Sequence, residues 1–526
     1  MPLQKNQVLT LRVERLSSDG SGVAHSPDGE TVFIPGAAPG DEARVRIVKD
    51  CKRYAFGILD EVLTPSPDRI PVDCAVAGPC GGCSLRHLDY AAELRAKQEN
   101  VADAFARIGG LDVPVLPIVG SPEVNRYRNK VQFPVGVDKS GKPCIGFYAG
   151  RTHRIVPCPD CRLQPGVLNE IGNALCAFFA EKGIQPYSEE TGRGLVRHIF
   201  LRRGAHSGQI MVCLVCTRAR LPYAEELCTR LKAQFAEITT ILLNVNAKNT
   251  NVILGTETHT LYGQGYIEDT LCGVPVQLGP LSFYQVNTLA AEQLYGIAAQ
   301  YAQLTPDDLL LDLYCGMGTI GLSMAAHCRE LIGVEIVPEA IESAKANAAR
   351  MGADVAAKSR FFCADAGQAA TRLAAEGLHP DIVMLDPPRK GCDEATLSAV
   401  VRMAPRRVVY VSCNPATAAR DAAWLEQNGY HAEKVQPVDL FPRTRHCEAV
   451  LLLSKLHVDR HIEVDVNMEE LDVTAAESKA TYNEIRDYVW EHHQLKISNL
   501  YIAQVKQKYG IIERENYHKA KNENAK

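Results

Sequence analysis

From residue 283 onward, short apolar runs alternate with alanine-rich helical stretches, and this repeat constrains the fold more than any other feature of the chain. The apolar runs occupy residues 309–313, 330–335, 381–385 and 408–411. Stretches such as residues 340–350 lie between them and have helical composition. Strands that alternate with helices pair in parallel, because each helix carries the chain back across the sheet. The pattern predicts a doubly wound, Rossmann-like domain over residues 281–455.

The rest of the chain divides into three further regions, so we expect a multi-domain α/β protein. Its 526 residues suit about three domains of ~150 residues each. Short alternating runs between Gly, Pro and Asp turns predict an OB-like barrel of five strands over residues 1–63. Residues 68–280 show mixed α+β patterning, and residues 456–526 are predicted to form a linker and a helical extension.

Finer patterns predict individual elements within these regions. In the central region, residues 85–108 have helical periodicity, and residues 130–137, 195–202 and 210–217 alternate like strands. In the C-terminal region we expect an acidic linker, two amphipathic helices and a disordered tail, at residues 459–472, 481–493, 498–509 and 519–526.

Composition indicates a soluble globular protein without a membrane anchor. Apolar residues make up 46% of the chain and charged residues 23%, as is usual for soluble domains. No run of about 18 apolar residues is present, and residues 1–7 lack the apolar core of a signal peptide. We therefore expect a cytoplasmic protein. The net charge of −5 excludes a global cationic field, so any surface for nucleic acid must be local.

One cysteine lies where an α/β sheet gathers its chemistry. Residues 407–411 have the pattern of a buried strand, and the chain breaks at Asn414-Pro415, which leaves Cys413 at the carboxyl end of that strand. Ligands of open α/β sheets bind at this edge, so the Cys413 thiol is a candidate nucleophile. The alternative is an unreactive buried cysteine, which is the common role of free cysteines.

A glycine-rich turn after the first strand of the repeat predicts a nucleotide-type pocket. Gly316 and Gly318 permit a sharp turn and a close approach of a ligand to the backbone. Glu335 ends the next strand, where an acid accepts hydrogen bonds from ribose hydroxyls, unless it is only a surface acid. Gly321 is one position early for the third glycine of a dinucleotide fingerprint, which favours S-adenosylmethionine. Asp386 lies at the end of a later strand, directly before two prolines. We expect it to contact the cofactor or the substrate base; the alternative is that it only forms a turn.

A second group of cysteines has the spacing of a metal site. Cys74, Cys80 and Cys83 lie in a glycine-rich loop, and Cys158 or Cys161 can supply a fourth thiolate. The chain has 18 cysteines, and clustered cysteines in a reducing compartment indicate metal binding or catalysis more often than disulfides. Four thiolates bind either zinc or a [4Fe–4S] cluster, and the spacing alone leaves that choice open.

Basic stretches with aromatic neighbours predict RNA contacts. In the central region these are residues 126–130 and 193–198, followed by Arg202 and Arg203, and their composition fits phosphate contacts and base stacking. In the first region, Tyr54 and Phe56 are interleaved with a basic hairpin, which favours RNA over a merely solvated face. The cations of that hairpin are Arg44, Arg46, Lys49, Lys52 and Arg53.

Five ordered motifs resemble the RNA 5-methyluridine methyltransferase family. They are Phe283-Tyr-Gln-Val-Asn287, Asp312-Leu-Tyr-Cys-Gly-Met-Gly318, Asp386-Pro-Pro-Arg389, Ser412-Cys-Asn-Pro415 and His446-Cys-Glu448. Residues 1–455 are similar to the family throughout, and the start of the chain resembles its RNA-binding TRAM domain. The resemblance implies an enzyme that transfers a methyl group from S-adenosylmethionine to C5 of uracil in RNA.

The resemblance also implies roles for particular residues. It implies Cys413 as the nucleophile and Glu448 as the base, although a solvated loop acid is the default role for a glutamate. It favours [4Fe–4S] over zinc, with Cys161 preferred to Cys158 as the fourth ligand. Cofactor contacts are implied for Gln285, Tyr314, Glu335 and Asp386, beside the turn of Gly316 and Gly318.

Several alternatives stay open at this point. We expect 23S rRNA as the substrate, because the iron–sulfur cysteines accompany rRNA enzymes in the family, and tRNA is the alternative. A non-catalytic RNA-binding protein with a methyltransferase fold is another class. The intact set of Cys413, Glu448, Asp386 and Glu335 argues against it. His446 either orients the uracil, shuttles protons or only packs. A monomer is expected, and residues 457–526 lie outside the family pattern.

Overall fold

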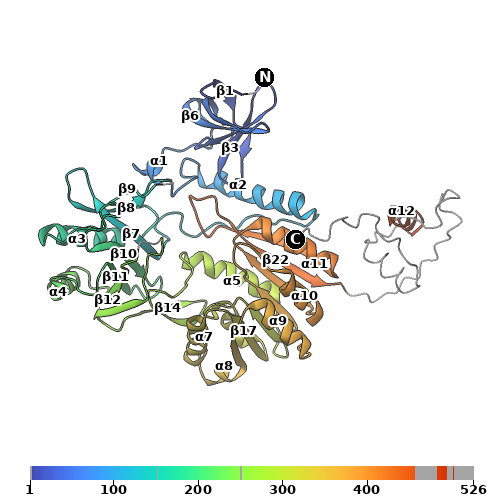
Figure 1. The fold of residues 1–526 in the computed structure, drawn as a ribbon. Helices are drawn as coiled ribbons and strands as arrows, with labels where there is room; N and C mark the ends of the chain where they lie inside the picture. Colours follow the sequence, from blue (N-terminus) through green and yellow to red (C-terminus); the bar gives the residue numbers. More distant parts are fainter. Residues whose placement is uncertain (1–2, 151, 249–250, 457–481, 494–501, 503–526) are drawn as a thin grey trace, which may run out of the picture.

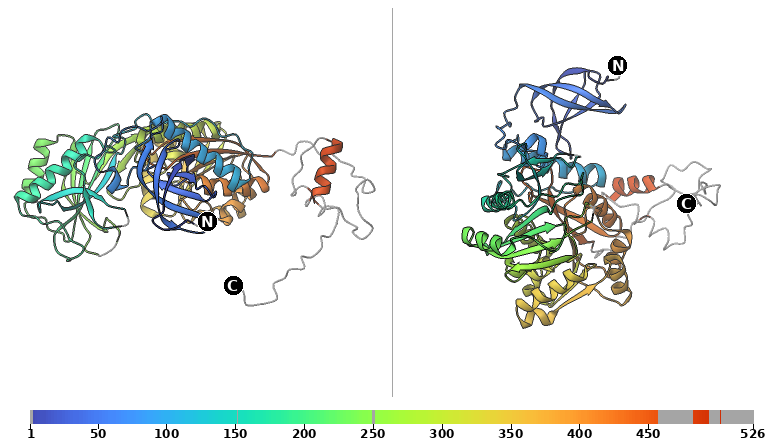
Figure 2. Two further views of the ribbon diagram at one scale, coloured as in Figure 1. Left: turned by 90° about the horizontal axis from the view of Figure 1, so that it is seen from above. Right: turned by 60° about the vertical axis from the view of Figure 1, so that its left-hand side comes forward.

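The computed structural model describes residues 3–150, 152–248, 251–456, 482–493 and 502. Three large sheets lie in three separate bodies, and the N-terminal barrel stands at one end of the molecule (Figure 1). The central sheet lies beside the largest α/β body in both further views (Figure 2). The predicted multi-domain α/β architecture, with a barrel first and a doubly wound domain later, is confirmed. Within the described ranges, no helix is long and apolar enough to cross a membrane.

The N-terminal barrel is one six-stranded sheet with the strand order β1-β5-β6-β4-β3-β2. In β5, buried and exposed residues alternate through Ile47, as a strand with one buried face requires. Alternation predicts five strands, and the additional β2 has only two residues, too few to show a period. The strands are β1 (Val8–Arg12), β2 (Arg15–Leu16), β3 (Ser21–His25), β4 (Thr31–Pro35), β5 (Glu42–Asp50) and β6 (Tyr54–Thr64).

The central sheet has seven strands in the order β13-β12-β11-β10-β7-β8-β9. Helices α3 (Gly166–Glu181) and α4 (Ala224–Gln234) cover one face. The other face, which includes Phe200 and Met211, packs toward the α/β body. The strands are β7 (Lys130–Val137), β8 (Pro143–Tyr148), β9 (Ile155–Pro157), β10 (Val196–Arg203), β11 (Ile210–Cys216), β12 (Ile238–Val245) and β13 (Glu257–Tyr262), followed by the hairpin β14 (Ile267–Leu271) and β15 (Val274–Leu278).

The α/β body contains a seven-stranded sheet with the order β18-β17-β16-β19-β20-β22-β21. Five neighbouring strands are parallel, whereas β22 runs antiparallel between β20 and β21. The strand order reverses between β16 and β19, where doubly wound sheets bind their ligands. The strands are β16 (Leu309–Leu313), β17 (Glu330–Glu335), β18 (Ser359–Cys363), β19 (Ile382–Leu385), β20 (Arg407–Ser412), β21 (Tyr430–Val438) and β22 (Glu448–Lys455).

Helices of this body pack on both faces of the sheet (Figure 1). They are α5 (Thr288–Ala302), α6 (Thr319–Met324), the 3-10 turn η2 (Ala325–His327), α7 (Pro338–Arg350), α8 (Ala353–Lys358), α9 (Ala366–Ala375), α10 (Glu394–Met403) and α11 (Pro415–Gln427).

A helix from the chain between barrel and central sheet packs on the α/β body. This helix, α2 (Tyr90–Asp103), begins after Asp89, whose side chain accepts a hydrogen bond from the amide of Ala92. It therefore starts later than the periodicity from residue 85 predicts, and it continues as a π-helix, η1 (Ala104–Gly109). Val101 and Phe105 are buried in the apolar cluster that includes β16 and β19. The short α1 (Ala77–Cys80) precedes it.

After residue 456 the structure describes one helix, α12 (Tyr482–His493). It coincides with the first helix expected in the C-terminal extension. The expected linker at residues 459–472, the second helix at 498–509 apart from Ile502, and the tail at 519–526 lie outside the described residues.

Candidate active site

Cys413 lies at the carboxyl end of β20, in the turn that leads into α11. Ser412 Oγ accepts a hydrogen bond from the amide of Asn414 at 3.0 Å. The side chain of Asn414 caps α11 by accepting from the amide of Ala416, and its Nδ2 donates to the carbonyl oxygen of Arg389 at 3.0 Å. These bonds fix the turn and hold Cys413 in a half-buried position at the edge of the sheet.

Glu448 is the first residue of β22 and lies beside this cysteine. Because β20 and β22 are antiparallel with Ser412 opposite Ala449, the next pair in register brings Cys413 to Glu448. The Glu448 side chain is buried. Burial raises the pKa of Glu448 to about 8, and the nearby carboxylate of Asp386 adds to the shift. The structure therefore brings the predicted nucleophile, base and strand-end acid together.

The charged groups around the Cys413 thiol shift its pKa in opposite directions. Burial raises the pKa of Cys413, the carboxylates of Glu448 and Asp386 raise it further, and the hydrogen-bonded guanidinium of Arg389 lowers it. Burial also raises the pKa of Asp386 to about 7. In the ligand-free protein the thiol is therefore neutral near pH 7, and a cation placed beside it would favour the thiolate.

His446 lies on the same edge and is neutral near pH 7. Its Nδ1 is 3.3 Å from Nη2 of Arg389. Burial lowers the pKa of His446 to about 4, and the positive charges of Arg389 and Arg445 add to the shift. A neutral imidazole accepts a hydrogen bond from the guanidinium, which suits an orienting role more than proton shuttling.

The glycine turn after β16 faces the acid at the end of β17. Gly316 has φ 56° and Gly318 has φ 78°, left-handed conformations that glycine adopts without strain. Glu335 accepts hydrogen bonds from the amides of Gly316 at 3.2 Å and Val337 at 2.9 Å. The predicted ribose-binding acid and the predicted ligand turn are thus in contact.

The two other residues predicted to contact the cofactor are Tyr314 and Gln285. Tyr314 directly follows β16 in the left-handed region, with φ 68°, which is unusual for a tyrosine. Its hydroxyl is 3.4 Å from Oγ1 of Thr396. Gln285 precedes α5, and its carbonyl oxygen accepts a hydrogen bond from Asn129 Nδ2 at 2.7 Å. The backbone of Gln285 is therefore tied to the central sheet.

Asp312 is a buried acid near the site. In the sequence it is named only as part of a motif, and no role is predicted for it. Its Oδ2 accepts from the amide of Gly321 at 3.0 Å, and its Oδ1 is buried without a hydrogen-bond partner among the described residues. Burial raises the pKa of Asp312 to about 8, and the charges of Asp386 and Glu335 add to the shift. An acid inside the apolar strand Leu-Leu-Leu-Asp-Leu was the available signal, because buried unpaired acids are rare.

The four cysteines expected to bind metal approach one another around α1: Cys74, Cys80, Cys83 and Cys161. The pKa of Cys80 is raised by burial and by the thiols of Cys161 and Cys74. Cys158 is buried and its thiol hydrogen-bonds Cys161, which lowers the pKa of Cys161 to about 7. As the side chains stand, no group of three or more His, Cys, Asp or Glu residues in the described chain is arranged to hold a metal ion.

Two of the arginines expected to contact RNA are bound inside the protein. Arg202 is 1% exposed and donates to the carbonyl oxygens of Gly279 and Ser282, both at 2.7 Å. Arg197 is also buried and donates to the carbonyl oxygen of Asn246 at 3.0 Å. The prediction of RNA contacts is therefore wrong for these two residues, because β10 is covered on both faces.

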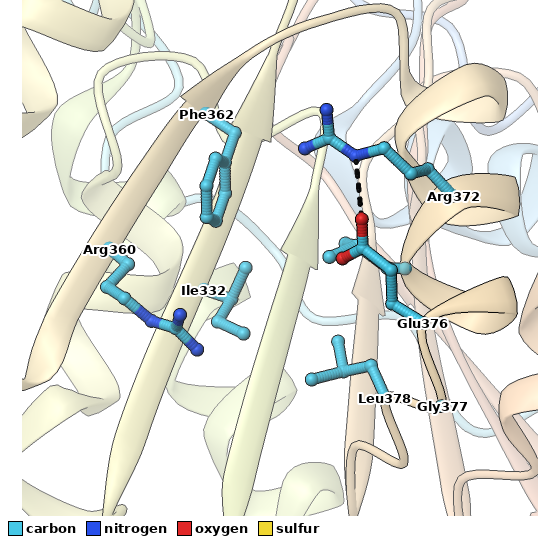
Figure 3. A pocket seen from close by; sticks show the side chains of 8 residues that line it. Ile332, Arg360, Phe362, Arg372, Glu376, Gly377 and Leu378 are labelled. Atoms are coloured by element: carbon cyan, nitrogen blue, oxygen red, sulfur yellow. Dashed lines mark ion pairs between the residues drawn. The ribbon is translucent and has the colours of Figure 1, made fainter.

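A cavity of about 380 Å³ lies elsewhere in the α/β body. Figure 3 shows Ile332 and Phe362 beside it, with Arg372 and Glu376 paired on the opposite wall. No residue of the predicted site lines this cavity, so we do not assign it to the chemistry. Its lining residues are Ile332, Arg360, Phe362, Arg372, Leu373, Glu376, Gly377 and Leu378.

Known proteins are similar to this chain in sequence. Residues 207–456 match the family described as tRNA (Uracil-5-)-methyltransferase, and residues 2–59 match the TRAM domain. An uncharacterized RNA methyltransferase of Halalkalibacterium halodurans is 43% identical over 453 residues, which cover 86% of this chain and 98% of the relative. One from Bacillus cereus is 41% identical over 456 residues, with the same shares of 86% and 98%.

A solved structure is also similar over most of the chain. It is the Pyrococcus abyssi tRNA (uracil-54, C5)-methyltransferase in complex with S-adenosyl-L-homocysteine. The TM-score is 0.67 at 26% identity, and the match covers 85% of this chain and 100% of that chain.

The fold and the site define an S-adenosylmethionine-dependent methyltransferase that acts on RNA. The chain belongs to the RNA uracil-5-methyltransferase family. The predicted TRAM domain, methyl donor and RNA substrate class are confirmed.

Proposed function

We propose that this enzyme methylates C5 of a uridine in 23S rRNA through a covalent adduct between Cys413 and C6 of the base, with Glu448 as the general base. The observation that supports the proposal most strongly is the register of β20 and β22, which sets the thiol beside the Glu448 carboxyl. A nucleophile and a base are the two protein groups that this chemistry needs.

The chemistry follows from the weak nucleophilicity of C5 in uracil. Cys413 first loses its thiol proton to water; the thiolate then forms a bond from Sγ to C6, and the electrons of the C5–C6 double bond move toward C5 and O4. S-adenosylmethionine supplies a methyl group, whose bond to sulfur breaks as its bond to C5 forms. Glu448 then removes the C5 proton, the C5–C6 double bond forms again, and Cys413 leaves as a thiolate. The products are 5-methyluridine, S-adenosylhomocysteine and a proton held on Glu448.

Donor binding prepares both protein groups for these steps. The pKa of Glu448 is raised to about 8 and that of Asp386 to about 7 in the ligand-free site. A sulfonium cation nearby lowers the pKa of each carboxyl and also that of the Cys413 thiol. The site therefore becomes a base and a nucleophile when the methyl donor is in place.

The choice of 23S rRNA is supported by the cysteine set, since the resemblance links these cysteines to the rRNA enzymes of the family. A tRNA uridine is the second candidate. It is favoured by the family description and by the Pyrococcus abyssi relative, which is named for uracil-54 of tRNA.

We further propose a [4Fe–4S] cluster held by Cys74, Cys80, Cys83 and Cys161. Four thiols are the donors that such a cluster needs. Amides point at two of the sulfurs: that of Gly82 at Cys80, and those of Leu163 and Gln164 at Cys161. Among the described residues the side chains as they stand are not arranged around a metal ion, so they would have to turn toward the cluster. The cluster would order the glycine-rich loop, and no step of methyl transfer passes through it. Protein purified without oxygen should contain iron and acid-labile sulfide, and Cys83→Ser should lose both. Stoichiometric zinc without iron would overturn the assignment.

The function is tested by transferring labelled methyl groups to purified rRNA and tRNA. Wild-type enzyme should label 23S rRNA, and Cys413→Ala should lower the rate by more than ~1,000-fold. Cys228→Ala is the matched control, because Cys228 lies in α4 of the central region, away from the catalytic edge. Label in tRNA alone would select the second candidate.

Glu448→Gln tests the order of the steps. Without the base, the methylated adduct cannot lose its C5 proton, so enzyme and RNA should stay covalently joined. Denaturing electrophoresis would then show a protein–RNA band that carries label. Full turnover by Cys413→Ala, or free labelled RNA at the normal rate from Glu448→Gln, would refute the mechanism.

A further inference from the structure

Three cations in the central sheet gather without an acid to neutralise them. Arg202 of β10 is opposite Lys130 of β7 in the antiparallel register, so their side chains share one face. Arg128 lies two residues before Lys130 and is the second cation that acts on it. In the part of the chain that the structure describes, none of the three is paired with a carboxylate.

Among the described residues, Lys130 is partly exposed and has no hydrogen-bond partner, whereas Arg128 is hydrogen-bonded to Tyr127 and lies over its ring. The guanidinium of Arg202 donates hydrogen bonds to two carbonyl oxygens of the protein. Lys130 is half-buried, and Nζ makes no hydrogen bond within the described residues. Burial lowers the pKa of Lys130 to about 8, and the charges of Arg202 and Arg128 add to the shift. A group of cations that is partly desolvated and lacks a counter-ion is complementary to an anion.

The segment of these cations is bonded to the segment that contains Gln285, one of the predicted cofactor contacts. Asn129, between Arg128 and Lys130, donates to the carbonyl oxygen of Gln285 at 2.7 Å and to Oγ1 of Thr288 at 2.9 Å. The segment of Gln285 also exposes Phe283, at 71%. On the other side, the positive charge of Arg128 contributes to the lowered pKa of His446. Residues 128–130 therefore adjoin the segment of Gln285, and the charge of Arg128 reaches His446 at the end of the sheet that carries Cys413.

We propose that Lys130 binds a backbone phosphate of the RNA strand next to the target uridine, with Arg128 nearby, while the buried Arg202 adds its charge from inside the protein and does not touch the RNA. The proposal rests on the proposed function, since it assigns a subsite of the same active site. A phosphate fits because lysine contacts it as a point charge, and because an unpaired strand entering the site carries one phosphate for each nucleotide. The contact is independent of base identity and holds the strand while the uridine is turned toward Cys413.

The test measures the salt dependence of RNA binding. Wild type, Lys130→Gln and Lys139→Gln are titrated with a short oligouridylate in the presence of S-adenosylhomocysteine, by fluorescence anisotropy. Each phosphate contact to single-stranded nucleic acid contributes about −0.7 to the slope of log K against log salt. Lys130→Gln should therefore flatten the slope by about 0.7 to 1 and weaken binding about five- to tenfold near 0.1 M salt.

Matched variants separate this contact from general effects. Lys139 is an exposed lysine just beyond the far end of β7, so Lys139→Gln removes the same charge and should leave slope and affinity unchanged. Lys130→Arg keeps the positive charge and should therefore keep the wild-type slope. A substitution that unfolded the protein would not keep it. Oligoadenylate should lose affinity in Lys130→Gln by the same factor as oligouridylate, because a phosphate contact does not read the base.

Two results would overturn the inference. The first is a slope for Lys130→Gln equal to those of wild type and Lys139→Gln. The second is a loss of S-adenosylhomocysteine affinity in Lys130→Gln as large as the loss of RNA affinity, which would assign the anion to the carboxylate of the methyl donor. If instead the slope flattens as expected but wild type methylates no RNA, the phosphate site stands and the proposed function fails.

Discussion

At the scale of single residues, the end of the sheet that carries Cys413 gathers buried acids whose pKa values lie near or above neutral pH. Burial raises the pKa of Asp312 and Glu448 to about 8 and that of Asp386 to about 7. Carboxyls that interact this strongly titrate as a set rather than one by one. A sulfonium complements the set, since it carries positive charge and has no proton to lose.

S-adenosylmethionine should therefore bind more tightly as the pH rises from about 6 to about 8, whereas S-adenosylhomocysteine should change much less. Each carboxyl that ionises attracts the sulfonium but not the neutral thioether, and the amino groups of the two ligands titrate alike. The ratio of the two dissociation constants should change about tenfold, equivalent to one pKa unit. Calorimetry on RNA-free enzyme measures both, and Asp386→Asn should flatten the trend. Parallel pH profiles for the two ligands would contradict the argument.

The sequence locates some of these residues and not others. Cys413, Asp386 and Glu335 follow from the rule that chemistry collects at the carboxyl ends of parallel strands. Glu448 has no such local signal, because its place is decided by β22, which inserts antiparallel between β20 and β21. That pairing joins distant parts of the chain, so only the family resemblance indicated the residue.

At the scale of elements, α2 supports the loop that leads to the catalytic base. Lys97 is buried, and its Nζ donates to Glu93 at 2.7 Å, to Asp439 at 2.8 Å and to the carbonyl oxygen of Phe441 at 3.2 Å. Glu93 also accepts from the amide of Arg443 at 2.7 Å. One helix thus fixes both ends of the segment that precedes His446 and Glu448.

Lys97→Met should destabilise the protein by about 3–5 kcal/mol, because it leaves two carboxylates buried without their cation. Urea unfolding measures that loss. Glu93→Gln keeps the hydrogen bonds and should cost less, so it reports on the loop in a folded enzyme. Its adduct with RNA should persist longer than in wild type, because Glu448 is held less firmly. An adduct lifetime equal to wild type in Glu93→Gln would mean that α2 does not position the base.

The sequence pattern predicts where strands begin and end better than it predicts which of their faces are buried. The expected strands at residues 130–137, 195–202 and 210–217 agree within one residue with β7, β10 and β11. The role expected for Arg202 fails because alternation within a strand does not say whether both faces are covered. The π-helical end of α2 also has no signal in the sequence, since it depends on the packing of η1 against α11.

At the scale of the whole molecule, the TRAM domain presents an exposed aromatic ring beside arginines whose charge is already paired. Arg44 is paired with Glu61 at 2.7 Å and Arg46 with Asp60 at 2.6 Å. The ring of Tyr54 packs edge-on against its neighbours Phe33 and Phe56, with centroids 5.8 and 5.7 Å apart, and is 42% exposed. Stacking on an unpaired base is the interaction that such a ring offers.

Tyr54→Ala should raise KM for RNA by about fivefold or more while kcat changes little, because a stacked base contributes ~1–3 kcal/mol to binding. Arg44→Gln is the matched control in the same barrel, and it should change KM much less, since its charge is already paired. Steady-state kinetics with RNA that the wild type methylates would separate the two. A larger effect from Arg44→Gln would show that charge, not stacking, dominates this surface.

The place of β22 also bears on how the enzyme is made. This strand carries Glu448 and fills the gap between β20 and β21, yet it is the last strand of the sheet to leave the ribosome. Until it emerges, the nascent chain holds the proposed nucleophile and the glycine turn but lacks Glu448, the residue proposed to release the product. The unfilled edge of β20 is also open to pairing with other chains. Ribosomes stalled before residue 448 would therefore expose an aggregation-prone edge, and any RNA that their chains captured could not be discharged.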